Sequence, residues 1–330
     1  MMGILISSRM IPPSLFGLAV LLAGGGTWAR LAGEEVIFRQ PALAGIGAAF
    51  YNPKVVRQPP PLGTFQMILW QPNPLQPDGR TVPVVWDAAA KTGLRVPSAR
   101  DGQTGFSDRA GSTVAQAAGG EVGAFLNSDD FAGRQCDKMM VTLQYKFPEA
   151  TQRRPFATAG GAVNVMLDLQ VPAAAGGGGQ DNNVYVSSDR QFTDPVRRVK
   201  ISNGVNLFHL GSGATATQNA GFDRHSGRYM LNVRLNPGTT WAYALPGNAR
   251  RQTAPFSGYR SYRYQVTRDG FAEALAALRK ANPSANISTD PKDYVLTMFH
   301  LNAELHCRAG HSELGWSMRN LQVSVGRTAP

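Results

Sequence analysis

Between residues 138 and 325, apolar side chains recur at every second position in one segment after another. In residues 138–147, for example, Val141, Leu143 and Tyr145 alternate with polar residues. A period of two places such residues on one face of a β-strand, because successive side chains of a strand point to opposite sides. Further strands are predicted in residues 162–171, 184–188, 197–210, 228–236, 239–245, 294–307 and 313–325.

Helical periodicity is limited to one segment near residues 269–282. Asp269 is placed to cap its start, and Asn282 followed by Pro283 is placed to end it. Glycine and proline are abundant, with 36 and 22 residues, whereas charged residues make up only 17% of the chain. We therefore predict an all-β protein, a two-sheet antiparallel β-sandwich of the jelly-roll kind with one short helix.

The first 29 residues resemble an export signal. Arg9 precedes an apolar run at residues 15–22, and the small residues Thr27 and Ala29 fit a cleavage site. The run is shorter than the ~20 residues of a membrane-spanning helix, so we expect a secreted or periplasmic protein with no membrane span after signal removal. An uncleaved membrane anchor is the alternative.

Residues 30–135 are rich in proline and glycine, and we expect them to pack onto a β-sandwich core at residues 136–330. Proline removes hydrogen-bond donors from a sheet, so the prolines in this part of the chain limit the length of its strands. We therefore predict only short strands, at residues 64–70 and 81–87. Residues 88–135 are rich in Gly, Ala, Ser and Asp and are expected to form long loops with at most one helical turn.

The net charge indicates which class of partner the protein binds, and the cysteine content bears on disulfide formation. The net charge of +11 favours an anionic partner such as an acidic polysaccharide, although it is equally compatible with a role in solubility alone. Nucleic acid is not expected, because no compact recognition motif is present and export argues against that role. Cys136 and Cys307 could form one disulfide in an oxidising compartment. Their wide spacing is not that of a zinc site.

Residues 294–307, YVLTMFHLNAELHC, place His300, Asn302, Glu304 and His306 on one face of a strand. Side chains two apart on a strand are about 6.6–7 Å apart, so His300 and His306 are roughly 20 Å apart. The four residues therefore cannot share one metal ion. A zinc site of Glu304, His306 and an unidentified third ligand is conceivable, but no metal is predicted. A row of this length suits a long partner, such as a polysaccharide in a groove.

Strand patterns of this kind over residues 138–325 resemble the jelly-roll or concanavalin-like architecture of exported carbohydrate-binding and carbohydrate-cleaving proteins. The resemblance implies a polysaccharide ligand on an open sheet face. The Glu-x-Asp-x-x-Glu strand motif of laminarinase-like hydrolases is absent, and so is the Arg-rich strand pattern of the commonest alginate-lyase family. The sequence therefore identifies no family.

Two reactions fit the polar row. In a glycoside hydrolase, Glu304 and a second carboxylate, for which Asp168 is the candidate, would flank the scissile bond. In a polysaccharide lyase, Asn302 or Arg234 would neutralise a uronate carboxylate, and a histidine or tyrosine would remove the ring proton. The predicted catalytic residues are Glu304, His300, His306 and Asp168, and the predicted substrate-binding residues are Asn302, Asn164, Asn232, Arg234, Trp241 and Tyr262.

Competing interpretations remain at this point. The polar row could be a solvated sheet face, and the aromatic residues could be ordinary strand residues. The sequence GHSEL at residues 310–314 lacks the second glycine of a nucleophile elbow, and the glycine-rich segments lack the features of a phosphate loop. No cofactor is predicted. The rival to a carbohydrate-active protein is a non-catalytic surface or assembly protein that uses the sandwich for protein–protein contacts.

Overall fold

The computed structural model describes residues 34–40, 46–47, 62–63, 65–70, 104–107, 113–116, 121–128, 138–176, 183–211, 218–223, 227–306 and 311–327. The predicted export signal, the strand at residues 81–87, Cys136 and Cys307 lie outside these residues. The signal, that strand and the disulfide therefore stay predictions.

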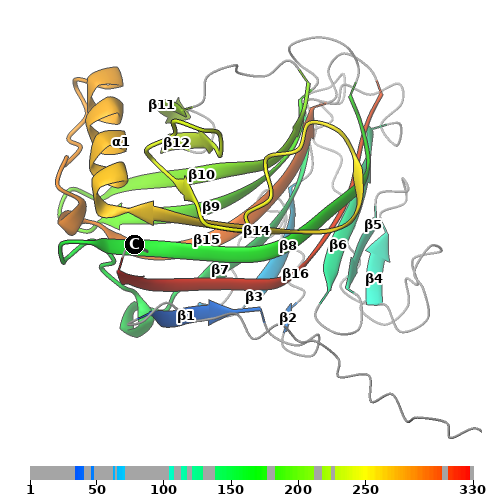
Figure 1. Ribbon diagram of the computed structural model, residues 1–330, viewed down its shortest axis with the longest axis horizontal. Coiled ribbons are helices and arrows are strands. Elements are labelled where there is room, and N and C mark those ends of the chain that lie inside the picture. Colours follow the sequence, from blue (N-terminus) through cyan, green and yellow to red (C-terminus); the bar gives the residue numbers. More distant parts are fainter. Residues whose placement is uncertain are drawn as a thin grey trace, which may run out of the picture. The chain divides into compact units, whose positions relative to one another are not determined.

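The described strands form two sheets that face each other (Figure 1). Sheet A has the order β13 (Tyr243–Ala244), β14 (Phe256–Thr267), β8 (Gly161–Gly176), β16 (Ser312–Arg327), β6 (Val122–Asn127), β5 (Thr113–Gln116) and β4 (Thr104–Ser107), with β1 (Glu35–Arg39) also paired to β16. Sheet B has the order β11 (Gln218–Asp223), β12 (Arg228–Arg234), β10 (Val199–Leu210), β9 (Val184–Asp194), β15 (Val295–His306), β7 (Lys138–Lys146), β3 (Phe65–Trp70) and β2 (Ile46–Gly47). Among these strands only the pairs β10–β12 and β2–β3 are parallel.

The alternating apolar residues of both sheets meet in one core. Val163 and Val165 of β8 and Phe299 and Leu301 of β15 are completely buried there, as the period of two predicts. Burying each such side chain contributes about 1.5–3 kcal/mol to folding. The predicted all-β sandwich is thereby confirmed, and each sheet keeps a second face turned away from the core, which we call its outer face.

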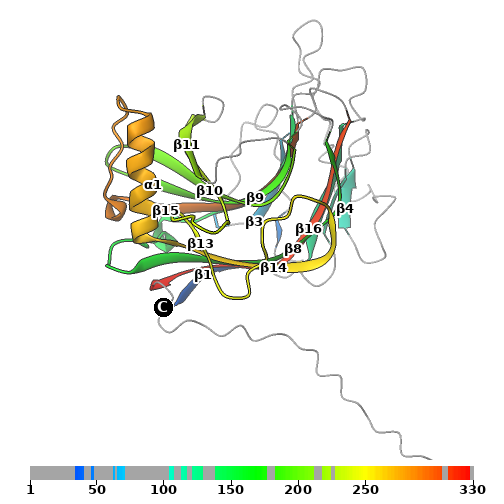
Figure 2. The ribbon, with the colours of Figure 1, turned by 45° about the horizontal axis from the view of Figure 1, so that its top comes forward.

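Irregular register bends the central strands. The pairing shifts between Asn206 and Phe208 on β10, between Leu296 and Met298 on β15, and between Gly315 and Ser317 on β16. Extra residues at such bulges increase the local twist and bend a strand. Figure 2 shows the resulting curvature of β9, β8 and β16.

Helix α1 (Arg268–Ala281) lies at one end of the two sheets (Figure 1). Thr267 caps it by accepting a hydrogen bond from the Gly270 amide, so the prediction of Asp269 as the cap is wrong by two residues. Asn282 ends the helix, as predicted. Phe271 anchors it, because its ring lies 4.6–5.5 Å from the rings of Phe192, Phe156 and Tyr294.

The described residues also contain two short 3-10 helices, η4 (Glu149–Thr151) and η5 (Pro291–Asp293). In the part of the chain that the structure describes, no helix is long and apolar enough to cross a bilayer.

The segment at residues 88–135 departs from expectation. We expected loops there, but β4, β5 and β6 form an antiparallel part of sheet A. Their strand signal is weak because glycine and serine interrupt the apolar pattern, and the pairing of β4 with β5, of β5 with β6 and of β6 with β16 supplies the missing stability. Conversely, only residues 243–244 of the strand expected at 239–245 are paired.

Candidate functional site

Strand β15 carries the polar row on the outer face of sheet B. Leu301, Ala303 and Leu305 point into the core and are fully buried, which leaves the intervening polar residues on the other side. Across from them, β9 places Asp189 opposite His300, Ser187 opposite Asn302, and Tyr185 opposite Glu304. The row therefore faces a second set of polar side chains on the neighbouring strand.

A hollow of about 220 Å³ opens on this face. It is lined by side chains of five strands and one adjoining residue: Asn183, Tyr185, Ser187, Asp189, Asn206, His209, Asn219, Met230, Asn232, Arg234 and Asn302. Three residues predicted to bind substrate, Asn232, Arg234 and Asn302, thus come together. Five asparagine amides supply both donors and acceptors, which is what sugar hydroxyl groups require.

Glu304 is the centre of a hydrogen-bonded cluster beside the hollow. Its Oε1 accepts a hydrogen bond from His306 Nε2 at 2.8 Å, and Tyr185 lies opposite it on β9. The ring of Tyr185 lies 6.3 Å from that of His306 and 6.0 Å from that of His209. Burial, together with the neighbouring Glu304 carboxylate, raises the pKa of Tyr185 well above its usual value of 10. Its hydroxyl is therefore protonated at neutral pH.

Asp189 is the centre of a second cluster at the floor of the hollow. Its Oδ2 accepts hydrogen bonds from Ser187 Oγ at 2.7 Å and Asn302 Nδ2 at 2.9 Å. His300 Nε2 lies 3.7 Å away, and burial lowers the pKa of His300 to about 4 despite the nearby carboxylate. Asp189 thus orients Asn302 through a hydrogen bond. His300 itself is 5% exposed.

His209 reaches this face because the bulge at residues 206–208 shifts it there, opposite Tyr185. Its Nε2 lies 3.2 Å from Asn183 Oδ1, and its Nδ1 has no hydrogen-bond partner among the described residues. Burial and the charge of Arg234 lower the pKa of His209 to about 4. The imidazole is therefore neutral at neutral pH.

Gly204 is the residue of β10 that leaves space for the Asp189 carboxylate. A Cβ at this position would lie 2.3 Å from Asp189 Oδ1 and 3.1 Å from Asn232 Oδ1. Gly204→Ala is therefore expected to displace Asp189 from its partners and to lower the free energy of unfolding by about 1–3 kcal/mol. Chemical denaturation of the variant measures this change.

The matched control is Gly221→Ala on β11 of the same sheet, where a Cβ meets no atom within 4 Å. Its stability should stay within about 0.5 kcal/mol of the parent protein. Equal stability of the two variants would contradict the placement of Asp189.

Two predicted site residues lie on the outer face of the other sheet. Asp168 of β8 accepts hydrogen bonds from Ser261 Oγ and Asn320 Nδ2, both at 2.7 Å, and Asn164 donates to Glu34 Oε1 at 3.1 Å. Asp168 and Glu304 therefore do not share a face, and the expected pairing of these carboxylates across one bond does not fit the geometry. The alternation placed Asp168 on an outer face but did not say of which sheet.

Two predicted aromatic contacts lie inside the sandwich. Tyr262 is fully buried and donates a hydrogen bond to the carbonyl of Leu207 at 3.2 Å, and Trp241 packs in the same core. Neither side chain lines the hollow. Their interpretation as ordinary strand and core residues fits the structure better than stacking on a sugar.

Sequence reasoning missed Tyr185, Asp189 and His209. The first two share the face of Ser187 at a spacing of two, but β9 was expected to end at residue 188, before Asp189. His209 could not be placed, because a bulge reverses the alternation of its strand.

Glu304 and His306 are the two zinc ligands that the sequence suggested. Glu304 and His306 do meet, but no three His, Cys, Asp or Glu side chains within the described ranges are grouped so as to hold a metal ion.

No protein-family model and no curated protein matches the sequence. Similar solved structures include endoglucanase Cel12A from Rhodothermus marinus, with 11% identity, a TM-score of 0.37, and coverage of 66% of this chain and 87% of that chain. The family 11 xylanase from Neocallimastix patriciarum gives 12% identity, a TM-score of 0.30, and coverage of 70% and 94%. The xyloglucanase domain of NopAA from Sinorhizobium fredii gives 12% identity, a TM-score of 0.27, and coverage of 68% of this chain and 93% of that chain.

Proposed function

We propose that this is an exported carbohydrate-active protein that binds an acidic polysaccharide across the outer face of sheet B and cleaves it beside Glu304. The observation that carries the proposal is the Tyr185–Glu304–His306 cluster at the edge of a hollow lined by amides and Arg234. Titratable groups that converge on a hollow are the usual mark of an active site. The predicted export signal supports the location outside the cytoplasm.

Arg234 is the residue we assign to the anionic group of the substrate. It lines the hollow, is only 9% exposed, and burial lowers the pKa of its guanidinium. A bound carboxylate would favour the charged form that burial disfavours. A planar guanidinium also matches a carboxylate in shape, because it can donate two parallel hydrogen bonds.

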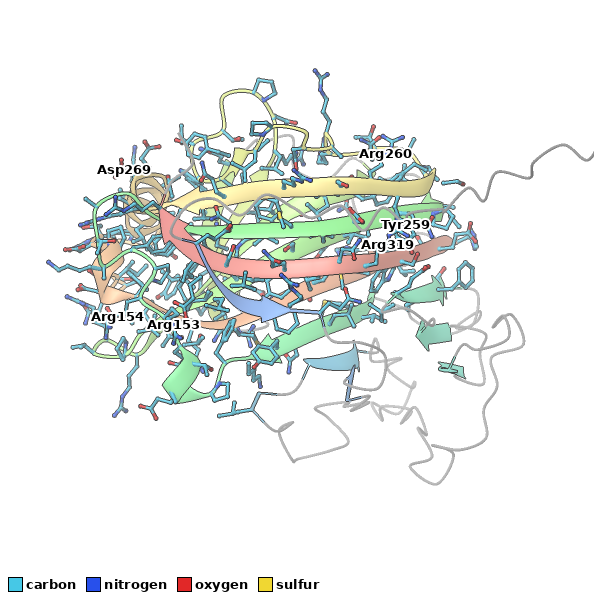
Figure 3. The ribbon with its side chains drawn as sticks, turned by 60° about the horizontal axis from the view of Figure 1, so that its bottom comes forward. Arg153, Arg154, Tyr259, Arg260, Asp269 and Arg319 are labelled. Atoms are coloured by element: carbon cyan, nitrogen blue, oxygen red, sulfur yellow. The ribbon has the colours of Figure 1, made fainter. Side chains whose placement is uncertain are left out.

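Arg234→Met is expected to weaken binding of uronate-containing polymers by about 10- to 100-fold, because hydrogen bonds to charged groups contribute about 1.5–3 kcal/mol. Binding of neutral polymers should change little. The control is Arg260→Met, an exposed arginine of β14 in sheet A (Figure 3), whose guanidinium lies over the ring of Phe256. Equal effects of the two substitutions would argue against the assignment of Arg234.

Activity on a panel of neutral and uronate-containing polysaccharides tests the function itself. New reducing ends indicate cleavage, and ultraviolet absorbance from unsaturated products distinguishes elimination from hydrolysis. In a hydrolase, Asp189 rather than Asp168 would be the second carboxylate, since it shares the face of Glu304. Absence of both binding and cleavage on every polymer would instead favour the non-catalytic surface or assembly protein.

A further inference from the structure

The cross-strand partner of Glu304 is a tyrosine rather than a second carboxylate. Tyr185 lies directly opposite Glu304 in the antiparallel pairing of β9 and β15, and the carboxylate acts on the phenol by raising its pKa. His306 lies two residues further along β15 and bonds the same carboxylate. The Glu304 carboxylate therefore has a phenol across from it and an imidazole bonded to it, and the two rings lie 6.3 Å apart.

The bond to Glu304 fixes the chemistry of His306. A carboxylate only accepts hydrogen bonds, so Nε2 carries the proton and Nδ1 carries the lone pair. The backbone is held as well, because the amide of His306 donates to the Asn183 carbonyl at 2.8 Å and its carbonyl accepts from Ser312 Oγ at 2.7 Å. His306 is thus an oriented base, in the way that a carboxylate orients the histidine of a catalytic triad.

Tyr185 has the complementary property. The phenol is a donor at neutral pH, since burial and the adjacent carboxylate keep it protonated. A base and an acid consequently stand side by side on one face of the sheet, next to the hollow that contains Arg234.

The positions of Asp189 and Glu304 in the sheet are farther apart than two-carboxylate hydrolysis requires. Glycoside hydrolysis with two carboxylates needs a separation of about 5–9.5 Å. Asp189 is paired with His300, four residues before Glu304, so the two backbone positions are about 13 Å apart along the strand direction. Asp189 is also 2% exposed and already accepts hydrogen bonds from Ser187 and Asn302.

We propose that the protein cleaves a 1,4-linked polyuronate by β-elimination, with His306 as the base and Tyr185 as the acid. This inference rests on the function proposed above. His306 Nδ1 takes the proton from C5 of the uronate, and the electron pair of the broken C5–H bond forms a C4=C5 double bond. The bond from C4 to the glycosidic oxygen breaks, and that oxygen takes a proton from the Tyr185 hydroxyl. The imidazolium then releases one proton and the phenolate regains one, so no water or oxidant is consumed.

Arg234 has a defined part in this step. Proton loss from C5 builds negative charge on the adjacent carboxylate, which a guanidinium in the hollow stabilises. Asn302 lies between the two clusters of the site. Its hydrogen bond to Asp189 fixes the position of the Asn302 side chain on the floor of the hollow.

The placement of the acid and base on one sheet face also selects the sugar. Both groups approach the ring from one side, so the C5 proton and the glycosidic oxygen at C4 must leave from the same side. Glucuronate and mannuronate residues present them in this way, whereas guluronate and galacturonate place them on opposite sides. We therefore expect polymers of glucuronate or mannuronate configuration to be the substrates.

The experiment compares 1,4-linked polyglucuronate and polymannuronate with polyguluronate. Absorbance of unsaturated products and reducing ends are measured together, and polymer binding is measured separately. The variants are Tyr185→Phe, which keeps the ring, and His306→Gln, with the exposed Tyr243→Phe as the control. We expect absorbance only with the first two polymers, a loss of at least about 100-fold in either site variant, and binding unchanged within about threefold.

Each other outcome is decisive. Reducing ends without absorbance would overturn elimination while leaving polysaccharide cleavage as the function. Full activity of Tyr185→Phe, or preference for polyguluronate, would overturn the assigned acid or the one-sided geometry. Failure of the parent protein to bind or cleave any polymer would overturn the proposed function together with this inference.

Discussion

Glu304→Gln is expected to lower polysaccharide cleavage by at least about 100-fold while polymer binding persists. Positioned acid–base groups contribute roughly 10²- to 10⁴-fold to a reaction, and Glu304 bonds His306 and lies opposite Tyr185. Glutamine keeps the size of the side chain but loses the charge, and its amide can donate to His306 and reverse which ring nitrogen carries the proton. Initial rates at saturating polymer measure the loss.

The matched control for this substitution is Glu313→Gln. Glu313 lies on β16 of the other sheet, where its carboxylate is 3.9 Å from His311 Nε2. Its replacement should leave cleavage within about twofold. If Glu304→Gln were as active as Glu313→Gln, the cleavage site would lie elsewhere on the protein.

The protein is expected to lose stability steeply as the pH falls from 6.5 towards 4. Burial lowers the pKa of both His209 and His300 from 6.5 to about 4. The charges of Arg234, Arg251 and His306 lower the pKa of His209 further. The charges of Arg228 and Arg190 do the same for His300. In this range the unfolded chain binds protons that the folded chain does not. The free energy of unfolding therefore rises with pH here, and each histidine contributes up to about 3 kcal/mol that is present above pH 6.5 and lost by about pH 4.

Urea denaturation at pH 7, 6 and 5 measures this slope. His209→Gln or His300→Gln should each remove up to about one proton from the proton uptake on unfolding. The free energy of unfolding should then change with pH by up to about 1.4 kcal/mol per pH unit less than in the parent protein. His311→Gln, at a more exposed site, serves as the control. A slope that both buried-site variants leave unchanged would show that neither histidine is held neutral in the folded protein.

The fold was largely predictable because its main strands carry a strong period of two. Residues 138–147 and 294–307 became strands of nearly the expected extent, and the strand expected at 162–171 runs five residues further, to Gly176. The pattern failed where packing rather than local sequence decides the structure. Strands β4 to β6 contain interrupted apolar patterns and depend on pairing with one another and, through β6, with β16.

The site was predictable only in part. Alternation placed His300, Asn302, Glu304 and His306 on one face, but it could not tell which sheet would hold Asp168 or that β9 would place Tyr185 opposite Glu304. Such relations depend on strand order and register, which are long-range properties of the chain. The bulge that exposes His209 to the hollow is likewise invisible in a simple period of two.

The most direct test of the binding face uses nuclear magnetic resonance of the Glu304→Gln variant, which should bind substrate without cleaving it. Backbone amide shifts are followed while a glucuronate or mannuronate oligosaccharide is added. The changes are expected to cluster on β9, β10, β12 and β15 around the hollow. Changes confined to the outer face of sheet A, around Tyr259 and Arg319 (Figure 3), would contradict the assignment of the groove to sheet B.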